Sequence, residues 1–241
     1  MKKIWACLLS AAFLMLSLCA CAEEKSSVTL GNVVVFGDSY STFKGKIPEG
    51  YAAYYSKSSY SFGVTSHKKT WWYKVVDRTN SNLLLNSSYS GTTICHTGYD
   101  GADYSEISFA ARMKVLVNSG YFAENRVDTL LILGGLNDYW AKSPVGEIKY
   151  EGITADDLYN VYPAFAYMLA LVREASPETR IIYISEEYLP EDMKASLHEI
   201  CACYGAEVVE MKGISKKDGH PDAVGMETMA DRIIEYLEIK R

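Results

Sequence analysis

Four short segments of this chain carry groups suited to acyl transfer. Ser39 offers a hydroxyl nucleophile, and His220 offers a base that can take its proton. Gly91 and Asn137 offer N–H donors for the oxyanion that forms on a substrate carbonyl. A glycine suits this role because its backbone can approach closely, and an asparagine amide brings two donors without a charge. With the backbone N–H of Ser39, these residues predict a site for acyl transfer.

Each of the four segments follows or lies near a predicted strand. A β-branched and aromatic run at residues 33–36 predicts a buried strand that stops at Gly37, and Ser39 follows it. Gly-Asp-Ser alone is also typical of an ordinary capped turn, so the other segments decide the interpretation. Sites on α/β sheets collect at the carboxyl ends of the strands. The other three segments are residues 86–93, 134–138 and 218–221.

Strand and helix patterns alternate five times, which predicts one α/β domain with a parallel sheet covered on both faces. Thr154 to Asp157 resembles a capping box that opens a long helix, with Pro163 as the point of a kink. The expected strands are residues 33–36, 83–85, 129–133, 180–185 and 207–209. The expected helices are residues 70–79, 108–117, the segment from 154 to about 176, 190–204 and the segment after 222.

The four segments, taken in order, resemble the conserved blocks of the SGNH/GDSL hydrolase family of lipases, acylhydrolases and esterases. Residues 37–41 resemble the GDSL box, residues 86–91 the second block, residues 135–138 the Gly-x-Asn-Asp block, and His220-Pro221 the last block. The resemblance implies a flavodoxin-like three-layer α/β/α sandwich with a five-stranded parallel sheet. It also implies ester hydrolysis through an acyl-enzyme, with no metal and no cofactor.

The last block departs from the family pattern. The family usually has an acid three residues before the histidine, but Lys217 stands there and Asp218 lies only two residues before His220. Two interpretations remain open for the group that orients the imidazole. Either the Asp218 carboxylate reaches it through a tighter turn that Gly219 permits, or a backbone carbonyl does so. We take Asp218 as the catalytic acid.

Aromatic residues surround the predicted site. Tyr40 and Thr92 stand beside the nucleophile and Gly91, and Tyr139 and Trp140 follow Asn137 closely, so we expect all four to bind substrate. Aromatic faces can stack on sugar rings. The alternative is that aromatic side chains here only pack the long irregular loop at residues 45–70 onto the sheet. We expect removal of small acyl groups such as acetyl from carbohydrate esters. The alternatives are a lipase, lysophospholipase or thioesterase, and an inactive carbohydrate-binding lipoprotein of the same fold.

The N-terminal residues have the pattern of an export signal. Lys2 and Lys3 precede an apolar run at residues 4–18, and small residues and cysteines follow. Residues 18–21 resemble the bacterial lipobox, in which Cys21 becomes lipidated. Plain secretion with cleavage after residues 20–22 is the alternative. We therefore expect a signal peptide at 1–21, a tether at 22–28 and the hydrolase domain at 29–241, exported and lipid-anchored at a bacterial cell envelope.

Charge and cysteine content limit the partners. The formal net charge is −6, and it becomes −8 when Lys2 and Lys3 are removed. An acidic chain without a basic cluster argues against nucleic acid and against electrostatic docking on anionic lipid. A small-molecule or glycan ester is the expected partner, with membrane contact only through the lipid anchor. Three cysteines remain in the body, Cys95, Cys201 and Cys203, an odd number without the spacing of a disulfide framework or a zinc site.

Overall fold

The computed structural model describes residues 25–240. The predicted signal peptide, the lipobox with Cys21 and the start of the tether lie outside the described residues. Among the helices of residues 25–240, none is long and apolar enough to cross a membrane.

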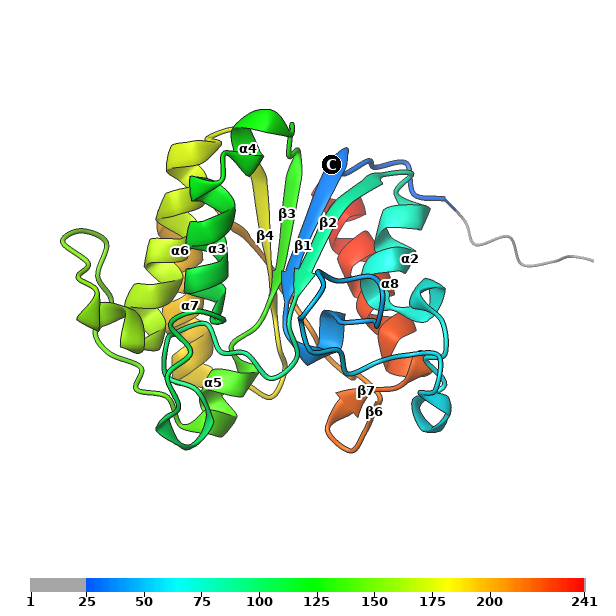
Figure 1. The fold of residues 1–241 in the computed structure, drawn as a ribbon. Coiled ribbons are helices and arrows are strands. Elements are labelled where there is room, and N and C mark those ends of the chain that lie inside the picture. Colours follow the sequence, from blue (N-terminus) through cyan, green and yellow to red (C-terminus); the bar gives the residue numbers. More distant parts are fainter. Residues whose placement is uncertain (1–24, 241) are drawn as a thin grey trace, which may run out of the picture.

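A five-stranded parallel sheet forms the centre of the domain, with strand order β2-β1-β3-β4-β5 (Figure 1). All five predicted strands are confirmed. Because β1 lies between β2 and β3, the chain changes direction across the sheet after β2. That change creates a switch point next to β1, the place where α/β folds bind ligands. The strands are β1 (Asn32–Gly37), β2 (Asn82–Ser88), β3 (Thr129–Leu133), β4 (Arg180–Ser185) and β5 (Glu207–Glu210).

Helices cover both faces of the sheet, which confirms the predicted α/β/α sandwich (Figure 1). Helices α2 and α8 pack together on one face, and α3, α6 and α7 pack on the other. Strand β1 from Val33 onward and the whole of β3 are buried and largely apolar, as expected of parallel strands covered on both sides. The helices are α2 (Trp71–Arg78), α3 (Phe109–Asn118), α4 (Tyr121–Glu124), α5 (Leu136–Ala141), α6 (Val161–Ala175), α7 (Glu191–Cys203) and α8 (Ala223–Ile239).

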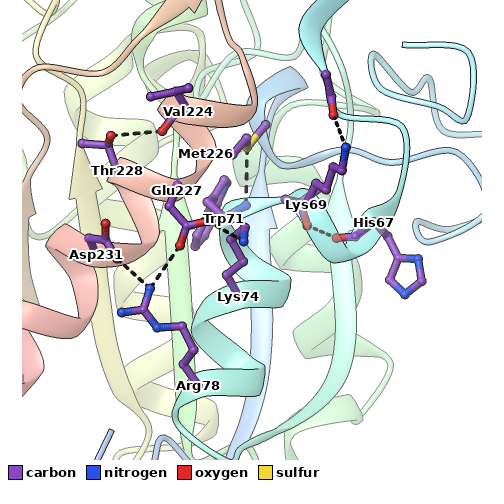
Figure 2. Close-up of polar contacts among 12 residues, drawn as sticks. His67, Lys69, Trp71, Lys74, Arg78, Val224, Met226, Glu227, Thr228 and Asp231 are labelled. Atoms are coloured by element: carbon purple, nitrogen blue, oxygen red, sulfur yellow. Dashed lines mark hydrogen bonds and ion pairs between the residues drawn. The ribbon is translucent and has the colours of Figure 1, made fainter. Parts of the chain in front are cut away.

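Ion pairs join α2 to α8 on one face of the sheet (Figure 2). Glu227 of α8 lies 2.5 Å from the Lys74 ammonium and 3.4 Å from the Arg78 guanidinium, and Asp231 lies 2.6 Å from that guanidinium. Exposed pairs contribute only about 0–1 kcal/mol each, but here several share partners in one network. The network fixes α8, the helix that begins three residues after His220.

The segment before α6 differs from the prediction. Thr154 and Asp157 do exchange the hydrogen bonds of a capping box, with the Thr154 N–H 2.8 Å from the Asp157 carboxylate. However, they stand at the start of a short 3₁₀ turn, η5 (Asp156–Tyr159), and α6 begins only at Val161. The prediction that this box opens the long helix is therefore wrong. Pro163 lies in the first turn of α6, where its missing N–H has no intrahelical acceptor to lose.

Candidate active site

Ser39 begins a 3₁₀ turn, η1 (Ser39–Ser41), directly beyond the carboxyl end of β1. Asp38 caps this turn: its carboxylate accepts a hydrogen bond from the Tyr40 N–H at 3.0 Å. The hydroxyl of Thr42 donates to the Ser39 carbonyl at 3.0 Å, which fixes the turn from its other end. Asp38 is buried, and this burial raises the pKa of its carboxyl group to about 7. These hydrogen bonds hold Ser39 in a fixed turn at the switch point of the sheet.

Ser39 and His220, 181 residues apart, form a hydrogen-bonded pair. Nε2 of His220 lies 3.0 Å from Oγ of Ser39, and Nδ1 lies 3.1 Å from the backbone carbonyl oxygen of Asp218. A carbonyl oxygen can only accept, so Nδ1 carries the ring proton and Nε2 is left to accept from the serine hydroxyl. This is the tautomer that a general base for Ser39 requires.

The geometry corrects our choice of the Asp218 carboxylate as the third catalytic group. Strands β6 (Lys216–Lys217) and β7 (His220–Pro221) form a hairpin in which Lys217 pairs with His220. Asp218 and Gly219 are its two loop residues, with φ of 47° and 75°, as a type I′ turn requires. In this turn the backbone carbonyl of Asp218, rather than its side chain, meets the imidazole. The second of our two interpretations is the one that the structure favours.

Aromatic rings hold the imidazole in place. The ring of Tyr54 stacks on that of His220, with centroids 3.6 Å apart and planes 6° apart. Tyr40 meets the same imidazole edge-on, with a centroid distance of 5.2 Å. Burial lowers the pKa of His220 below its ordinary value, so the ring is neutral and able to accept a proton at neutral pH. No local sequence pattern indicates that the ring of Tyr54 stacks on His220, 166 residues later in the chain.

Two tyrosine hydroxyls bind the backbone on either side of His220. The hydroxyl of Tyr40 donates to the carbonyl of Gly219, and that of Tyr55 donates to the carbonyl of Pro221 at 2.7 Å. Tyr40 is buried, so it supports the histidine hairpin and does not present its ring to substrate. The expectation that Tyr40 binds substrate is therefore wrong.

Three N–H groups are available for an oxyanion. Nδ2 of Asn137 donates to the Thr92 carbonyl at 3.0 Å, while Oδ1 accepts from the Tyr99 hydroxyl at 2.7 Å. These contacts fix the amide and leave its second N–H unused. The backbone N–H groups of Ser39 and Gly91 likewise have no acceptor within residues 25–240. Gly91 has φ of 80°, which favours glycine, and a Cβ there would meet nothing within 4 Å.

Two buried ionisable residues, Asp138 and Arg112, support these donors. Oδ1 and Oδ2 of Asp138 both lie 2.9 Å from the Ile94 N–H, which ties the loop after Gly91 to the start of α5. Burial raises the pKa of Asp138 to about 7. Arg112 of α3 donates to the carbonyls of Ser87 and Gly37 and lies 3.2 Å from Oγ1 of Thr92. Its guanidinium thus joins the carboxyl ends of β1 and β2 beneath the site.

Arg112 was not among the predicted site residues, and the role expected for Thr92 is wrong. Thr92 is buried. Its hydroxyl donates to the Tyr89 carbonyl at 2.9 Å and accepts a hydrogen bond from Arg112. It supports Asn137 through its carbonyl and does not contact substrate through its side chain. Arg112 stands among apolar residues of a predicted helix, and no local pattern indicates that its guanidinium turns toward the site. Burial lowers its pKa to about 10, so it stays charged at neutral pH.

Tyr139 and Trp140 lie where a substrate can reach them. They are 47% and 41% exposed and line a cavity of about 410 Å³. The cavity adjoins the hairpin that carries His220, since Gly219 lines it too. Its remaining lining residues are Tyr188 and Lys216. These two of the four expected substrate-binding residues thus stand at an open cavity beside the catalytic pair.

A second serine–histidine pair does not qualify as a site. Nε2 of His198 lies 2.9 Å from Oγ of Ser185, and Nδ1 lies 3.9 Å from a carboxylate oxygen of Glu210. Ser185 is only 1% exposed, and the 3.9 Å separation of Nδ1 from Glu210 is too long for a hydrogen bond that would orient the imidazole. Within the part of the chain that the structure describes, no group of three His, Cys, Asp or Glu residues is arranged to hold a metal ion.

Comparison with known proteins identifies the family. The model of the GDSL-like Lipase/Acylhydrolase family matches residues 31–237. The chain belongs to this family. It is an SGNH-type ester hydrolase, and its five-stranded fold is the one that GDSL-like hydrolase structures share.

Solved structures of GDSL-like hydrolases resemble this one closely. A protein from Bacteroides ovatus, named as a GDSL-like lipase, is 39% identical, with a TM-score of 0.81 over 88% of this chain and 99% of that one. A second, from Bacteroides uniformis, is 37% identical, with a TM-score of 0.77 over 86% and 94% of the two chains. A family two carbohydrate esterase from Clostridium thermocellum shares the fold at 17% identity, with a TM-score of 0.59 over 90% and 65%. No curated protein matches this sequence.

Proposed function

We propose that this GDSL-like hydrolase removes small acyl groups, above all acetyl, from carbohydrate esters. The observation that carries the chemistry is the 3.0 Å contact between Nε2 of His220 and Oγ of Ser39, with Nδ1 bound to the Asp218 carbonyl. Both atoms of the pair have the protonation that nucleophilic attack needs.

In the proposed mechanism, Oγ of Ser39 attacks the ester carbonyl while Nε2 of His220 takes its proton. The N–H groups of Ser39 and Gly91 and the free N–H of Asn137 stabilise the oxyanion. His220 then gives its proton to the leaving alcohol, and an acyl-enzyme remains on Ser39. Water, activated by the same imidazole, releases the acid and restores the hydroxyl. The Asp218 carbonyl holds the imidazolium by its Nδ1–H bond, a partial charge in place of the usual carboxylate.

Two observations support a carbohydrate ester as the substrate. Exposed Tyr139 and Trp140 line the cavity beside His220, together with Lys216, and this lining is not the aliphatic groove that a long acyl chain needs. The fold neighbours also include structures described as carbohydrate esterases. Their identity to this chain is 17% or less, so they support the substrate class only by analogy.

We also propose that the hydrolase is exported and held at the cell envelope by a lipid on Cys21. The support for this is the sequence alone: a charged start, an apolar run and a lipobox-like segment at residues 18–21. An anchor of this kind would keep the domain near extracellular polymers.

A panel of esters tests the proposal. Acetyl, butyryl and decanoyl p-nitrophenyl esters and acetylated xylo-oligosaccharides are compared by kcat/KM, with Ser39→Ala as the control. We expect acetyl esters to be preferred and the oligosaccharide to be deacetylated. Preference for decanoyl esters would indicate a lipase instead. A fluorophosphonate probe labels only an activated serine, so failure to label Ser39 would indicate an inactive binding protein.

A further inference from the structure

The cavity beside His220 lies between the two loops that carry the catalytic groups. Tyr139 and Trp140 belong to α5, the helix that also carries Asn137, and Gly219 belongs to the turn before His220. A Cβ placed on Gly219 would lie 3.8 Å from Cη2 of Trp140, so the indole reaches the histidine hairpin. At about 410 Å³ the cavity has the size of small-molecule sites, roughly 300–1,000 Å³.

Lys216 brings a largely buried amine to this cavity. Its side chain is only 10% exposed, and Nζ lies 2.9 Å from Oε2 of Glu186, which is buried behind it. Nζ also lies over two aromatic rings, 4.1 Å from the centroid of Tyr188 and 5.0 Å from that of Tyr40. These contacts fix the ammonium group in position, and a fixed donor is able to distinguish one ligand geometry from another.

The charge of Lys216 is already matched. Because Glu186 forms an ion pair with it at 2.9 Å, the pair has no net positive charge, and Lys216 alone offers N–H donors. The whole chain is acidic, with a formal charge of −6. A ligand hydroxyl can accept from Lys216 at no electrostatic cost, whereas a ligand carboxylate would also meet the nearby charge of Glu186.

The direction of the reaction assigns the cavity to one part of the ester. His220 must return its proton to the leaving alcohol oxygen, so the alcohol part lies on the histidine side of the scissile bond. The carbonyl oxygen, in contrast, must lie near Gly91 and Asn137. Since Gly219 lines the cavity and precedes His220, the cavity adjoins the alcohol part.

We infer that this cavity is the subsite for the alcohol part of the ester and that it selects an uncharged sugar ring over a sugar carboxylate. The ring stacks on Trp140 or Tyr139, and Lys216 donates a hydrogen bond to one of its hydroxyls. The assignment to the alcohol part rests on the ester-hydrolysing function proposed above, but the preference for an uncharged ring can be measured without turnover.

The test uses Ser39→Ala, which cannot form an acyl-enzyme, and two probes that differ in one group. Methyl glucoside and methyl glucuronide share a ring, but the second carries a carboxylate. Binding is followed by the chemical shift of the Trp140 indole N–H. We expect the glucoside to shift this signal saturably and the glucuronide to bind at least about fivefold more weakly, since an unmatched charge costs binding. Equal or tighter binding of the glucuronide would overturn the proposal.

Two substitutions in the Ser39→Ala background locate the subsite. Trp140→Ala should weaken glucoside binding about three- to tenfold, the usual contribution of one aromatic contact. Because this variant lacks the Trp140 indole signal, its binding is followed by the NMR signals of the ligand. Lys216→Met should weaken it by a similar factor. Lys217→Met, at the exposed neighbouring position of the same strand, is the matched control and should leave the affinity unchanged. Trp140 is exposed, so its variant remains informative even if Lys216→Met fails to fold.

Turnover of p-nitrophenyl acetate by the unmodified chain separates the two proposals. If this ester is hydrolysed but Trp140→Ala and Lys216→Met leave glucoside binding unchanged, the subsite proposal is overturned and the proposed esterase function stands. Glucoside binding that both variants weaken supports the subsite, and absence of hydrolysis in the same preparation would then contradict the proposed function alone.

Discussion

The imidazole of His220 lies flat against the ring of Tyr54, with centroids 3.6 Å and planes 6° apart. Because the Asp218 carbonyl contacts only one ring nitrogen, this stacking is the second restraint that keeps Nε2 directed at Ser39. A carbonyl dipole orients a ring less firmly than a carboxylate does, so we expect the aromatic neighbour to contribute more here than in a full triad.

Replacement of Tyr54 tests this restraint. Tyr54→Leu keeps an apolar side chain against Tyr55 and Phe62 but removes the stacked ring, so kcat for p-nitrophenyl acetate should fall about tenfold. Tyr54→Phe keeps the ring and should retain nearly full activity. Steady-state kinetics of both variants provide the measurement. If the Phe variant lost as much activity as the Leu variant, the hydroxyl and not the stacking would be responsible.

The pH dependence of kcat/KM should report the burial of His220. Burial lowers the pKa of this imidazole below its ordinary value of roughly 6.5. The neutral ring is the active base, so activity should be full at neutral pH and should fall only as the pH drops through that lowered pKa. In Tyr54→Leu the ring is more exposed, and the acidic limb should move upward in pH. A limb that stayed in place would contradict this account of the shift.

The oxyanion donors predict a separate kinetic effect. Asn137→Ala removes the free N–H, and kcat should fall by about a hundredfold or more with little change in KM, the usual loss for one such donor. Tyr99→Phe is a milder control, because it removes only the hydroxyl that donates to Oδ1 of Asn137 at 2.7 Å. An effect of Asn137→Ala mainly on KM would show that this amide binds the substrate in its ground state.

The sequence predicts those parts of the fold and site whose cause is local. The apolar runs of β1 and β3 are continuous, so they identify buried parallel strands, and each leads into a segment with Ser39 or Asn137. The hairpin before His220 is also predictable from the sequence, because Asp-Gly favours a type I′ turn. That turn directs the Asp218 carbonyl to the imidazole. We chose the Asp218 carboxylate instead because the family pattern has an acid shortly before the histidine.

Other supporting residues act only across long stretches of chain. Arg112 binds carbonyls of β1 and β2 from a helix on one face of the sheet, and its sequence neighbours are apolar. Lys216 meets Glu186, 30 residues earlier in the chain. A buried cation or ion pair depends on which elements meet in three dimensions, so neither residue differs in sequence from an ordinary surface charge.

The lipid anchor makes a prediction about the expressed protein. If Cys21 is lipidated, the chain should partition into detergent phase, and Cys21→Ser should remain in the aqueous phase. Cys203→Ser is a control, since that exposed cysteine lies in the folded domain. Detergent partitioning of the whole-cell extract provides the measurement. A mature N-terminus at Glu23 would support plain secretion.

The role of the Asp218 carbonyl makes the sharpest prediction. Asp218→Asn keeps the backbone carbonyl, and Asn-Gly forms a type I′ turn as readily as Asp-Gly does, so the 3.1 Å contact to Nδ1 should persist. We expect kcat/KM to stay within about threefold of the unmodified enzyme, whereas loss of a true triad carboxylate costs about 10⁴-fold in kcat. Gly219→Val places a β-branched side chain at φ of 75° and should damage activity by distorting the hairpin. His220→Ala should abolish turnover in the same assay. A loss of several orders of magnitude in Asp218→Asn would restore the carboxylate as the third catalytic group.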